Sequence, residues 1–187
     1  NYKSAQVDQV YFPQIEVVGD IALSVDALAA ALGSKLDKDL GDFEKVRDNV
    51  KRKIFQLVEQ PTFPMRPQEI VSEIRNLMGY HDIIALDNGV YKIWFARNYL
   101  AFQPNTILLD NALATMGAGL PSAMLAALIH PNRKVMSICG DGGFMMNSQE
   151  IETAVRLNLN LVVLILNDSS YGMIRWKQAG SGFEDWG

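Results

Sequence analysis

The sequence has little of what several classes of protein require. Its 187 residues include one cysteine and two histidines, which excludes an internal disulfide framework and a cysteine-based zinc cluster. The purest apolar run, residues 161–166, is six residues long, whereas a membrane-spanning helix requires about 20. Basic residues do not predominate, because 17 Lys and Arg stand against 21 Asp and Glu. The resulting charge of −4 argues against a nucleic-acid partner, and we expect no membrane partner either.

The composition is that of an ordinary globular chain. Apolar residues make up 49% and charged residues 20% of the sequence, which excludes disorder as the main state and allows a sizeable core. The length suits one domain, or one domain with a piece of another. The first residue is Asn1 rather than Met, no signal peptide follows, and the sequence stops at Gly187. These ends suggest a piece of a longer cytoplasmic protein.

The first 60 residues predict a short strand and two helices. The strand covers residues 15–18, and a helix follows at residues 24–32 with Ser24 as its N-cap. Apolar side chains then recur every three or four positions between residues 36 and 57, which indicates a long amphipathic helix.

A cluster of prolines follows this helix and marks the best candidate for a linker. Pro61, Pro64 and Pro67 fall within seven residues, and proline both fixes φ and removes a backbone donor. We therefore predict a domain boundary here, with residues 1–60 on one side and residues 61–187 on the other.

Beyond the linker, strand and helix patterns alternate. The strand candidates are short apolar runs, and runs without polar interruption are typical of strands that are covered on both faces. The sequence therefore predicts an α/β fold, with a parallel sheet flanked by helices. The expected strands are residues 82–86, 106–109, 134–139 and 161–166, and the expected helices are residues 67–78, 90–99, 117–130 and 147–157.

Polar clusters follow two of these strands, where parallel sheets bind ligands. Residues 140–143 read Gly-Asp-Gly-Gly, and residues 167–170 read Asn-Asp-Ser-Ser, with 24 residues between the Gly-Asp-Gly and the Asn-Asp. That interval holds one helix and one strand, so we expect neighbouring strands and a crevice shared by Asp141 and Asp168. Two facing carboxylates would favour a divalent cation between them. The alternative is that the glycines form a tight turn and both acids merely cap helices.

Two further segments are weaker candidates. Residues 87–91, Asp-Asn-Gly-Val-Tyr, also lie between a strand and a helix and could contact a phosphate. Met116 precedes another helix, where methionine usually fills a core.

These motifs together resemble a known family. Gly140-Asp141-Gly142 followed by Asn167-Asp168 looks like the thiamine diphosphate motif, a Gly-Asp-Gly closed by Asn-Asn. Residues 144–154 closely resemble acetolactate synthase large subunits, and residues 11–20 resemble the end of that family's middle domain. The resemblance extends over nearly the whole chain. It implies a thiamine-diphosphate-binding fold, namely the diphosphate domain, preceded by the tail of a second α/β domain.

The resemblance also implies roles for particular residues. Asp141 and Asp168, with the backbone carbonyl of Ser170, would bind Mg²⁺ together with the diphosphate. Met116 would support the cofactor in its bent conformation, and the carbonyl of Ala114 would accept a hydrogen bond from its aminopyrimidine ring. The remaining residues implied to contact thiamine diphosphate are Asn88, Gly89, Val90, Tyr91, Gly140, Gly142, Gly143, Tyr171, Gly172 and Met173.

The implied activity is that of an acetolactate synthase. Such an enzyme decarboxylates pyruvate on thiamine diphosphate and condenses the hydroxyethyl carbanion with a second 2-keto acid, in amino-acid biosynthesis or in catabolism. The resemblance further implies a homodimer or tetramer with sites at the subunit interface, and FAD is open as a second cofactor of the full-length protein. The activating glutamate of the family belongs to a domain outside these residues, so we expect this chain alone to be inactive and assign no catalytic residue in it.

Two departures from the family pattern leave the substrate open. Asp168 replaces the second Asn of the motif, as in catabolic acetolactate synthases. The biosynthetic enzymes have a Trp that lines the substrate channel at the position of Lys177. In this sequence the Trp lies one position earlier, at Trp176. Two alternatives remain at this point: another thiamine diphosphate enzyme (pyruvate oxidase, glyoxylate carboligase or a 2-keto acid decarboxylase), or a non-catalytic nucleotide-binding α/β domain.

Overall fold

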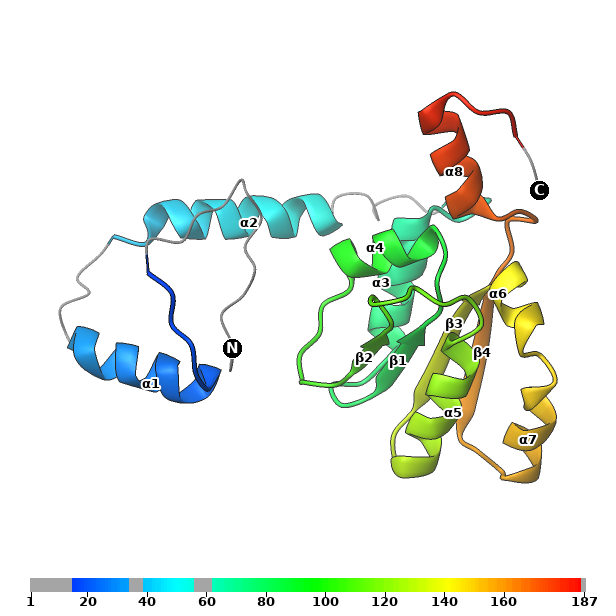
Figure 1. Cartoon of the computed structure of the whole chain (residues 1–187), viewed down its shortest axis with the longest axis horizontal. Coiled ribbons are helices and arrows are strands. Elements are labelled where there is room, and N and C mark those ends of the chain that lie inside the picture. Colours follow the sequence, from blue (N-terminus) through cyan, green and yellow to red (C-terminus); the bar gives the residue numbers. More distant parts are fainter. Residues whose placement is uncertain (1–14, 34–38, 56–61, 186–187) are drawn as a thin grey trace. The chain divides into compact units, whose positions relative to one another are not determined.

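The computed structural model describes residues 15–33, 39–55 and 62–185 (Figure 1). Contacts divide the chain into two compact units, residues 1–48 and residues 49–187, and we describe each by itself. The predicted boundary at residue 61 adjoins a segment outside the described residues, so it stays a prediction.

The first unit contains α1 (Ile21–Leu32) and the start of α2 (Gly41–Phe55). Helix α1 begins three residues before the predicted start, because Asp20 rather than Ser24 is its N-cap. The carboxylate of Asp20 accepts a hydrogen bond from the backbone N–H of Leu23 at 3.0 Å. The hydroxyl of Ser24 instead donates to the carbonyl oxygen of Asp20 at 2.6 Å. The amphipathic helix predicted between residues 36 and 57 is confirmed over the described part.

The strand predicted at residues 15–18 is wrong, because these residues have no regular secondary structure. A strand needs a neighbouring strand to satisfy its backbone groups. The described residues of the first unit form no strand that could pair with it.

The second unit is built on a parallel sheet of four strands. These are β1 (Ile83–Leu86), β2 (Ile107–Leu109), β3 (Val135–Gly140) and β4 (Leu161–Leu166), and their order across the sheet is β2-β1-β3-β4. All of the pairs are parallel, so the carboxyl ends of the strands meet at one edge. The predicted α/β fold and the predicted parallel sheet are therefore confirmed.

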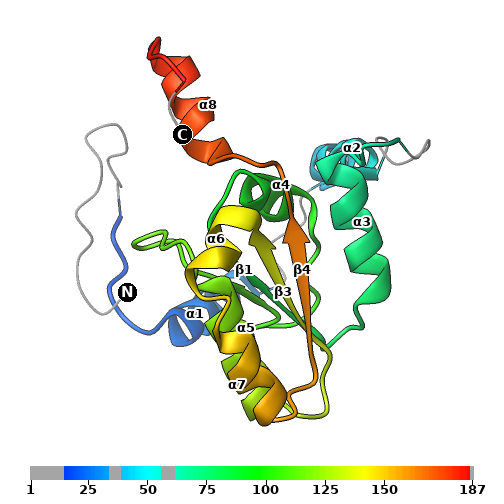
Figure 2. The same cartoon turned by 90° about the vertical axis from the view of Figure 1, so that its right-hand side faces the viewer.

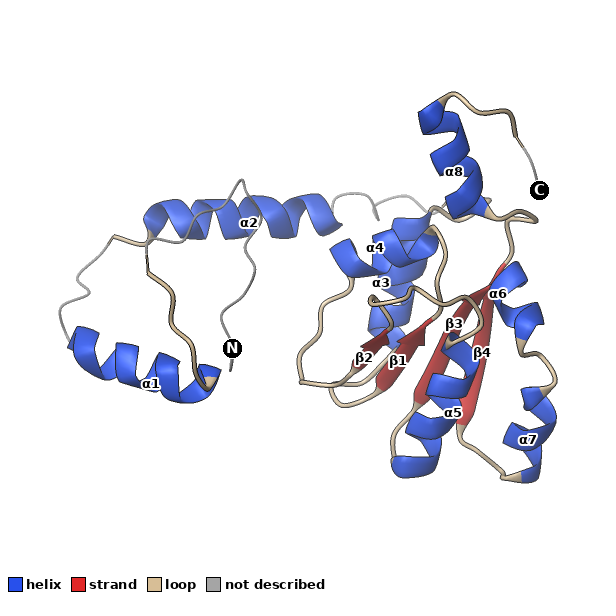
Figure 3. Cartoon of the chain, in the orientation of Figure 1, coloured by secondary structure: helices blue, strands red, loops and turns tan. Residues whose placement is uncertain are grey.

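Helices cover both faces of this sheet, and Figure 2 shows α3 on one side with α5, α6 and α7 on the other. The contacts given for these elements agree, because α3 packs on α4 and α5 packs on β1, β3 and α7. The elements are coloured by type in Figure 3. The helices are α3 (Pro67–Leu77), α4 (Tyr91–Asn98), α5 (Gly119–Ile129), α6 (Asp141–Met146), α7 (Glu150–Arg156) and α8 (Gly172–Ser181).

Strand β1 lies between two layers of the core, one on each face of the sheet, and its four residues are all buried. Successive side chains of a strand point to opposite faces. Ile84 and Leu86 therefore pack with α3 and α4, whereas Ile83 and Ala85 pack with α5. Burying each large apolar side chain in this way is worth about 1.5–3 kcal/mol.

Two sequence predictions need correction in this unit. Strand β4 was expected to be covered on both faces, yet Val162 and Ile165 are exposed, because the described helices leave part of each face of β4 uncovered. Residues 140–143 were expected to be a loop before a helix at residue 147, but α6 begins at Asp141 and α7 begins at Glu150. Two adjacent glycines disfavour a helix intrinsically, so its formation here depends on tertiary packing. Among the described residues, no helix has the length and apolar character needed to cross a membrane.

Candidate cofactor site

The strand ends, the start of α3 and the start of α8 surround a pocket of about 360 Å³. The sequence-predicted residues at these ends come together in its lining, with Ala114 as the exception. Those that line the pocket are Asn88, Gly89, Val90, Tyr91, Met116, Gly140, Asp141, Gly142, Gly143, Asp168, Ser170, Tyr171, Gly172 and Met173.

The two carboxylates of the motif enter this pocket from neighbouring strands. Gly140 at the end of β3 pairs with Leu166 at the end of β4. Asp141 follows the first of these residues directly, and Asp168 lies two positions beyond the second. Paired strands lie about 4.8 Å apart, so the two acids start from adjacent backbone positions. The predicted adjacency of the two strands is thus confirmed.

Neither acid caps a helix, which was the alternative explanation for both. Helix α6 has Gly140 at its N-cap, and α8 has Tyr171 there, and neither start has a side-chain cap. Asp168 instead accepts a hydrogen bond from the backbone N–H of Ser170 at 3.2 Å, which shapes the loop before α8.

The glycines of the site allow its walls to approach closely. A Cβ at Gly142 would lie 2.8 Å from Cε1 of Tyr171, and a Cβ at Gly172 would lie 2.5 Å from Oδ2 of Asp168. Both distances are shorter than real Cβ contacts, so a side chain at either position would require the ring of Tyr171 or the carboxylate of Asp168 to shift.

Asp87 begins the segment 87–91, which the sequence offered as a phosphate contact, but it does not line the pocket. Its side chain is completely buried at the end of β1. One carboxylate oxygen accepts from the backbone N–H of Asn88 at 2.7 Å, and the other accepts from that of Gly117 at 3.0 Å. A Cβ at Gly143 would clash with the same carboxylate. Asp87 therefore connects the end of β1 to the loop at Gly117 and lies close to Gly143 of α6.

Gly117, which follows Met116, is held by hydrogen bonds at both its backbone N–H and its carbonyl oxygen. Gly117 has a φ of +84°, which glycine adopts without strain. Its N–H donates to Asp87, and its carbonyl oxygen accepts from the side-chain amide of Asn147 at 2.7 Å. The side-chain amide of Asn88 also donates to the carbonyl oxygen of Thr115 at 2.6 Å. These bonds fix the loop that places Met116 in the pocket.

Tyr91 joins α4 to the Gly-Asp-Gly segment through its side chain. Its hydroxyl oxygen accepts a hydrogen bond from the backbone N–H of Gly140 at 2.9 Å. Burial raises the pKa of Tyr91 well above its usual value, and the nearby charge of Asp87 raises it further. The phenol therefore stays neutral at physiological pH.

Comparison with known proteins places this pocket in a family. Residues 87–185 match the model for the C-terminal TPP-binding domain of thiamine pyrophosphate enzymes, thiamine pyrophosphate being another name for thiamine diphosphate. The chain belongs to this family. The match covers the pocket residues from Asn88 onward, so the resemblance stated from the motifs is confirmed.

Several relatives of this chain are acetolactate synthases. It is 33% identical over 179 residues to acetolactate synthase of Bacillus subtilis, an alignment covering 93% of this chain and 31% of the relative. It is 35% identical over 176 residues to the catabolic acetolactate synthase of Raoultella terrigena, covering 91% and 31%. It is 26% identical over 175 residues to acetolactate synthase isozyme 1 large subunit of Escherichia coli, covering 94% and 31%. The chain thus spans about a third of the length of these relatives.

The side chains of the thiamine pyrophosphate enzyme pocket fit a hard divalent cation. Among the described residues, no three His, Cys, Asp or Glu side chains gather around one point. The pocket offers Asp141 and Asp168, and Mg²⁺ commonly uses one or two carboxylates with substrate phosphates and waters. The donor set therefore suits a metal-bound diphosphate.

Ala114 lies apart from the pocket lining and is exposed. Its φ of +52° is left-handed, which costs a residue with a Cβ about 1–2 kcal/mol. The segment is held by Asp110, whose carboxylate accepts from the N–H groups of Thr115 and Ala112 at 3.3 and 3.2 Å. These and other backbone hydrogen bonds lower the pKa of Asp110. The left-handed backbone at Ala114 therefore lies between residues that are hydrogen-bonded to Asp110.

Proposed function

We propose that the pocket binds thiamine diphosphate through Mg²⁺, and that the chain is part of an acetolactate synthase-like enzyme. The observation that carries the proposal is the placement of Asp141 and Asp168 in one pocket, at neighbouring strand ends, with neither side chain capping a helix. The family membership of residues 87–185 supports it. The acetolactate synthases among the relatives favour pyruvate as the substrate and a second 2-keto acid as the acceptor.

In this proposal the residues of the chain divide the binding between them. Asp141, Asp168 and the carbonyl of Ser170 bind Mg²⁺. Backbone groups on two sides of the pocket bind the diphosphate, and Met116 supports the cofactor. When bound, thiamine diphosphate supplies the electron sink for decarboxylation. The diphosphate groups come from Gly140–Gly143 and Tyr171–Gly172 on the metal side and from Asn88–Tyr91 at the opposite end, whereas the backbone of Met173 approaches the aminopyrimidine ring.

The remaining walls of the pocket are apolar and would exclude water from the bound group. Pro64, Met65, Ile70 and Trp94 line this part. Where these side chains displace water from the bound group, a charge pair such as Mg²⁺ with a carboxylate would be stronger than in solvent. Tyr91 contributes as a neutral hydrogen-bonding group, since its pKa is raised by burial.

The proposal extends to features of the whole protein. We infer a homodimer or tetramer, in which another domain supplies the glutamate that activates the cofactor, and FAD stays open as a second cofactor of the full-length protein. The 187 residues alone are then inactive. The thiamine pyrophosphate-containing protein YdaP of Bacillus subtilis, 35% identical over 127 residues, keeps another enzyme of this superfamily as the second candidate.

The test is a calorimetric titration of the intact protein with thiamine diphosphate, with Mg²⁺ and with a chelator in its place. We expect binding only with Mg²⁺, and no comparable binding of ADP with Mg²⁺. Binding of ADP instead would support the nucleotide-binding alternative and overturn the proposal. Supplying pyruvate to the loaded protein then separates the enzymes, since acetolactate supports the proposal whereas acetyl phosphate or acetaldehyde as the product contradicts it.

A further inference from the structure

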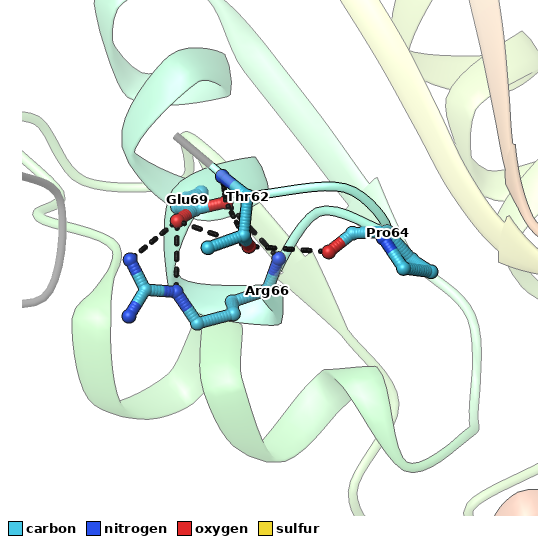
Figure 4. Close-up of polar contacts among 4 residues, drawn as sticks. All are labelled: Thr62, Pro64, Arg66 and Glu69. Carbon is cyan, nitrogen blue, oxygen red and sulfur yellow. Dashed lines mark hydrogen bonds and ion pairs between the residues drawn. The ribbon is translucent and has the colours of Figure 1, made fainter. Parts of the chain in front are cut away.

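A buried carboxylate lies at the start of α3, outside the motif that the family defines. Glu69 is only 3% exposed, and Figure 4 shows it together with Thr62, Pro64 and Arg66 of the preceding segment. Oε2 of Glu69 accepts hydrogen bonds from the backbone N–H groups of Arg66 at 3.1 Å and Thr62 at 3.3 Å. The first of these bonds is half of a capping box, because Glu69 is the third residue of the helix and Arg66 precedes the first.

Side chains complete the cluster around this carboxylate. The guanidinium of Arg66 donates to Oε1 of Glu69 from Nε at 2.8 Å and from Nη2 at 2.5 Å. The hydroxyl of Thr62 lies 3.1 Å from Oε2 of Glu69 and also 3.1 Å from the carbonyl oxygen of Pro64. One side chain of α3 thus holds both ends of the segment formed by residues 62–66.

The charge of Glu69 is maintained by these bonds. Burial by itself would raise the pKa of the carboxyl, but the hydrogen bonds from Arg66 and Thr62 outweigh this and lower it. Charge-assisted hydrogen bonds of this kind are about twice as strong as neutral ones. The segment is therefore tied to the helix by an ionised group at physiological pH.

The tied segment is a wall of the pocket. Pro64 and Met65, which lie between the two tied residues, both line it, as do Pro67 and Ile70 at the start of α3. Residues 62–66 form no helix or strand, so their conformation depends on side-chain contacts rather than on a backbone ladder. Glu69 therefore affects the pocket indirectly. It binds Thr62 and Arg66, and these residues flank Pro64 and Met65 in the wall.

We propose that Glu69 is a positioning residue of this pocket, which holds residues 62–66 so that Pro64 and Met65 form its apolar wall. The inference rests on the proposed function, because it takes thiamine diphosphate with Mg²⁺ as the occupant of the pocket. Glu69 touches no reacting atom in this role. Its removal loosens the wall, which weakens cofactor binding without altering the chemistry of the bound cofactor.

The experiment compares Glu69→Gln with Glu73→Gln in the intact protein. Glu73 lies one turn later on α3 and is exposed, so the control removes the same charge from the same helix. We expect Glu69→Gln to raise the dissociation constant of thiamine diphosphate at saturating Mg²⁺ about tenfold, equivalent to one charge-assisted hydrogen bond. The KM for the cofactor should rise equally, whereas kcat at saturating cofactor should stay within about twofold of the unsubstituted protein. Glu73→Gln should change neither constant.

A second variant guards against loss of folding in Glu69→Gln. Thr62→Val removes only the exposed hydroxyl and leaves the pair of Arg66 and Glu69 in place, and we expect it to weaken cofactor binding about twofold to threefold. A lower melting temperature with an unchanged affinity and KM in both variants would overturn the positioning role. A fall in kcat without a change in KM would also overturn it. No binding by the unsubstituted protein would overturn the proposed function, and the positioning role with it.

Discussion

The carboxylate of Asp87 and the backbone N–H of Gly117 form a fully buried hydrogen bond of 3.0 Å, although 30 positions separate them in the sequence. This bond connects the end of β1 to the loop that carries Met116. Its consequences can be measured, because a buried donor without a partner destabilises a protein substantially.

Asp87→Ala should lower the free energy of unfolding by about 1–3 kcal/mol, since it leaves the N–H of Gly117 buried without an acceptor. Urea unfolding measures the change. Asp42→Ala is the control, because that side chain is almost fully exposed. A loss for Asp87→Ala no larger than that of the control would show that the hydrogen bond contributes nothing to stability.

Gly143→Ala should be destabilising by about 1–3 kcal/mol, because its methyl group would clash with the carboxylate of Asp87. Gly180→Ala is the matched control, since it lies in α8 with no atom within 4 Å of the added carbon. Alanine is the better helix former, so this control should be neutral or stabilising by up to about 1 kcal/mol. Thermal unfolding of both variants tests the pair, and equal effects would contradict the close approach at Gly143.

The ionised state of Glu69 predicts how stability changes with pH. Its pKa in the folded protein is lower than the ordinary 4.5, so its contribution is fully present above that value and is lost as the pH falls through the folded pKa. Melting curves of the unsubstituted protein and Glu69→Gln should therefore differ most at neutral pH and converge in acid. A difference that stays constant down to pH 3 would argue against an ionised Glu69.

Cys139 should resist alkylation in the native protein. Its side chain is completely buried, and burial raises the pKa of its thiol to about 11, so little reactive thiolate exists at pH 8. Mass spectrometry of the peptide that contains Cys139 should show iodoacetamide labelling only after denaturation. Labelling within minutes under native conditions would contradict this burial.

The strands could be predicted from the sequence because short apolar runs that end at polar residues are a local signal. The strand Leu161–Leu166 was predicted to the residue. Its adjacency to the preceding strand, β3, was predicted from the length of the connection between them. The exposure of Val162 could not be predicted, because it depends on which helices cover the faces of β4.

The features that sequence reasoning missed depend on contacts between distant segments. Asp87 had a visible signal, an acid directly after a buried strand, but the residues close to its carboxylate lie in the loop at Gly117 and in α6 at Gly143. Helix α6 contains two adjacent glycines, so local propensity argued against it. Glu69 had the spacing of a capping residue, yet its link to the pocket requires the fold of residues 62–66.

The most direct test of the central claim is cofactor binding by Asp141→Ala and Asp168→Ala in the intact protein, titrated with thiamine diphosphate at several Mg²⁺ concentrations. Asp185→Ala is the control, because that acid is exposed, pairs with Arg175 and does not line the pocket. We expect both pocket variants to lose Mg²⁺-dependent binding while the control binds as the unsubstituted protein does. Unchanged affinity and Mg²⁺ dependence in both pocket variants would contradict the claim that these two carboxylates bind the metal.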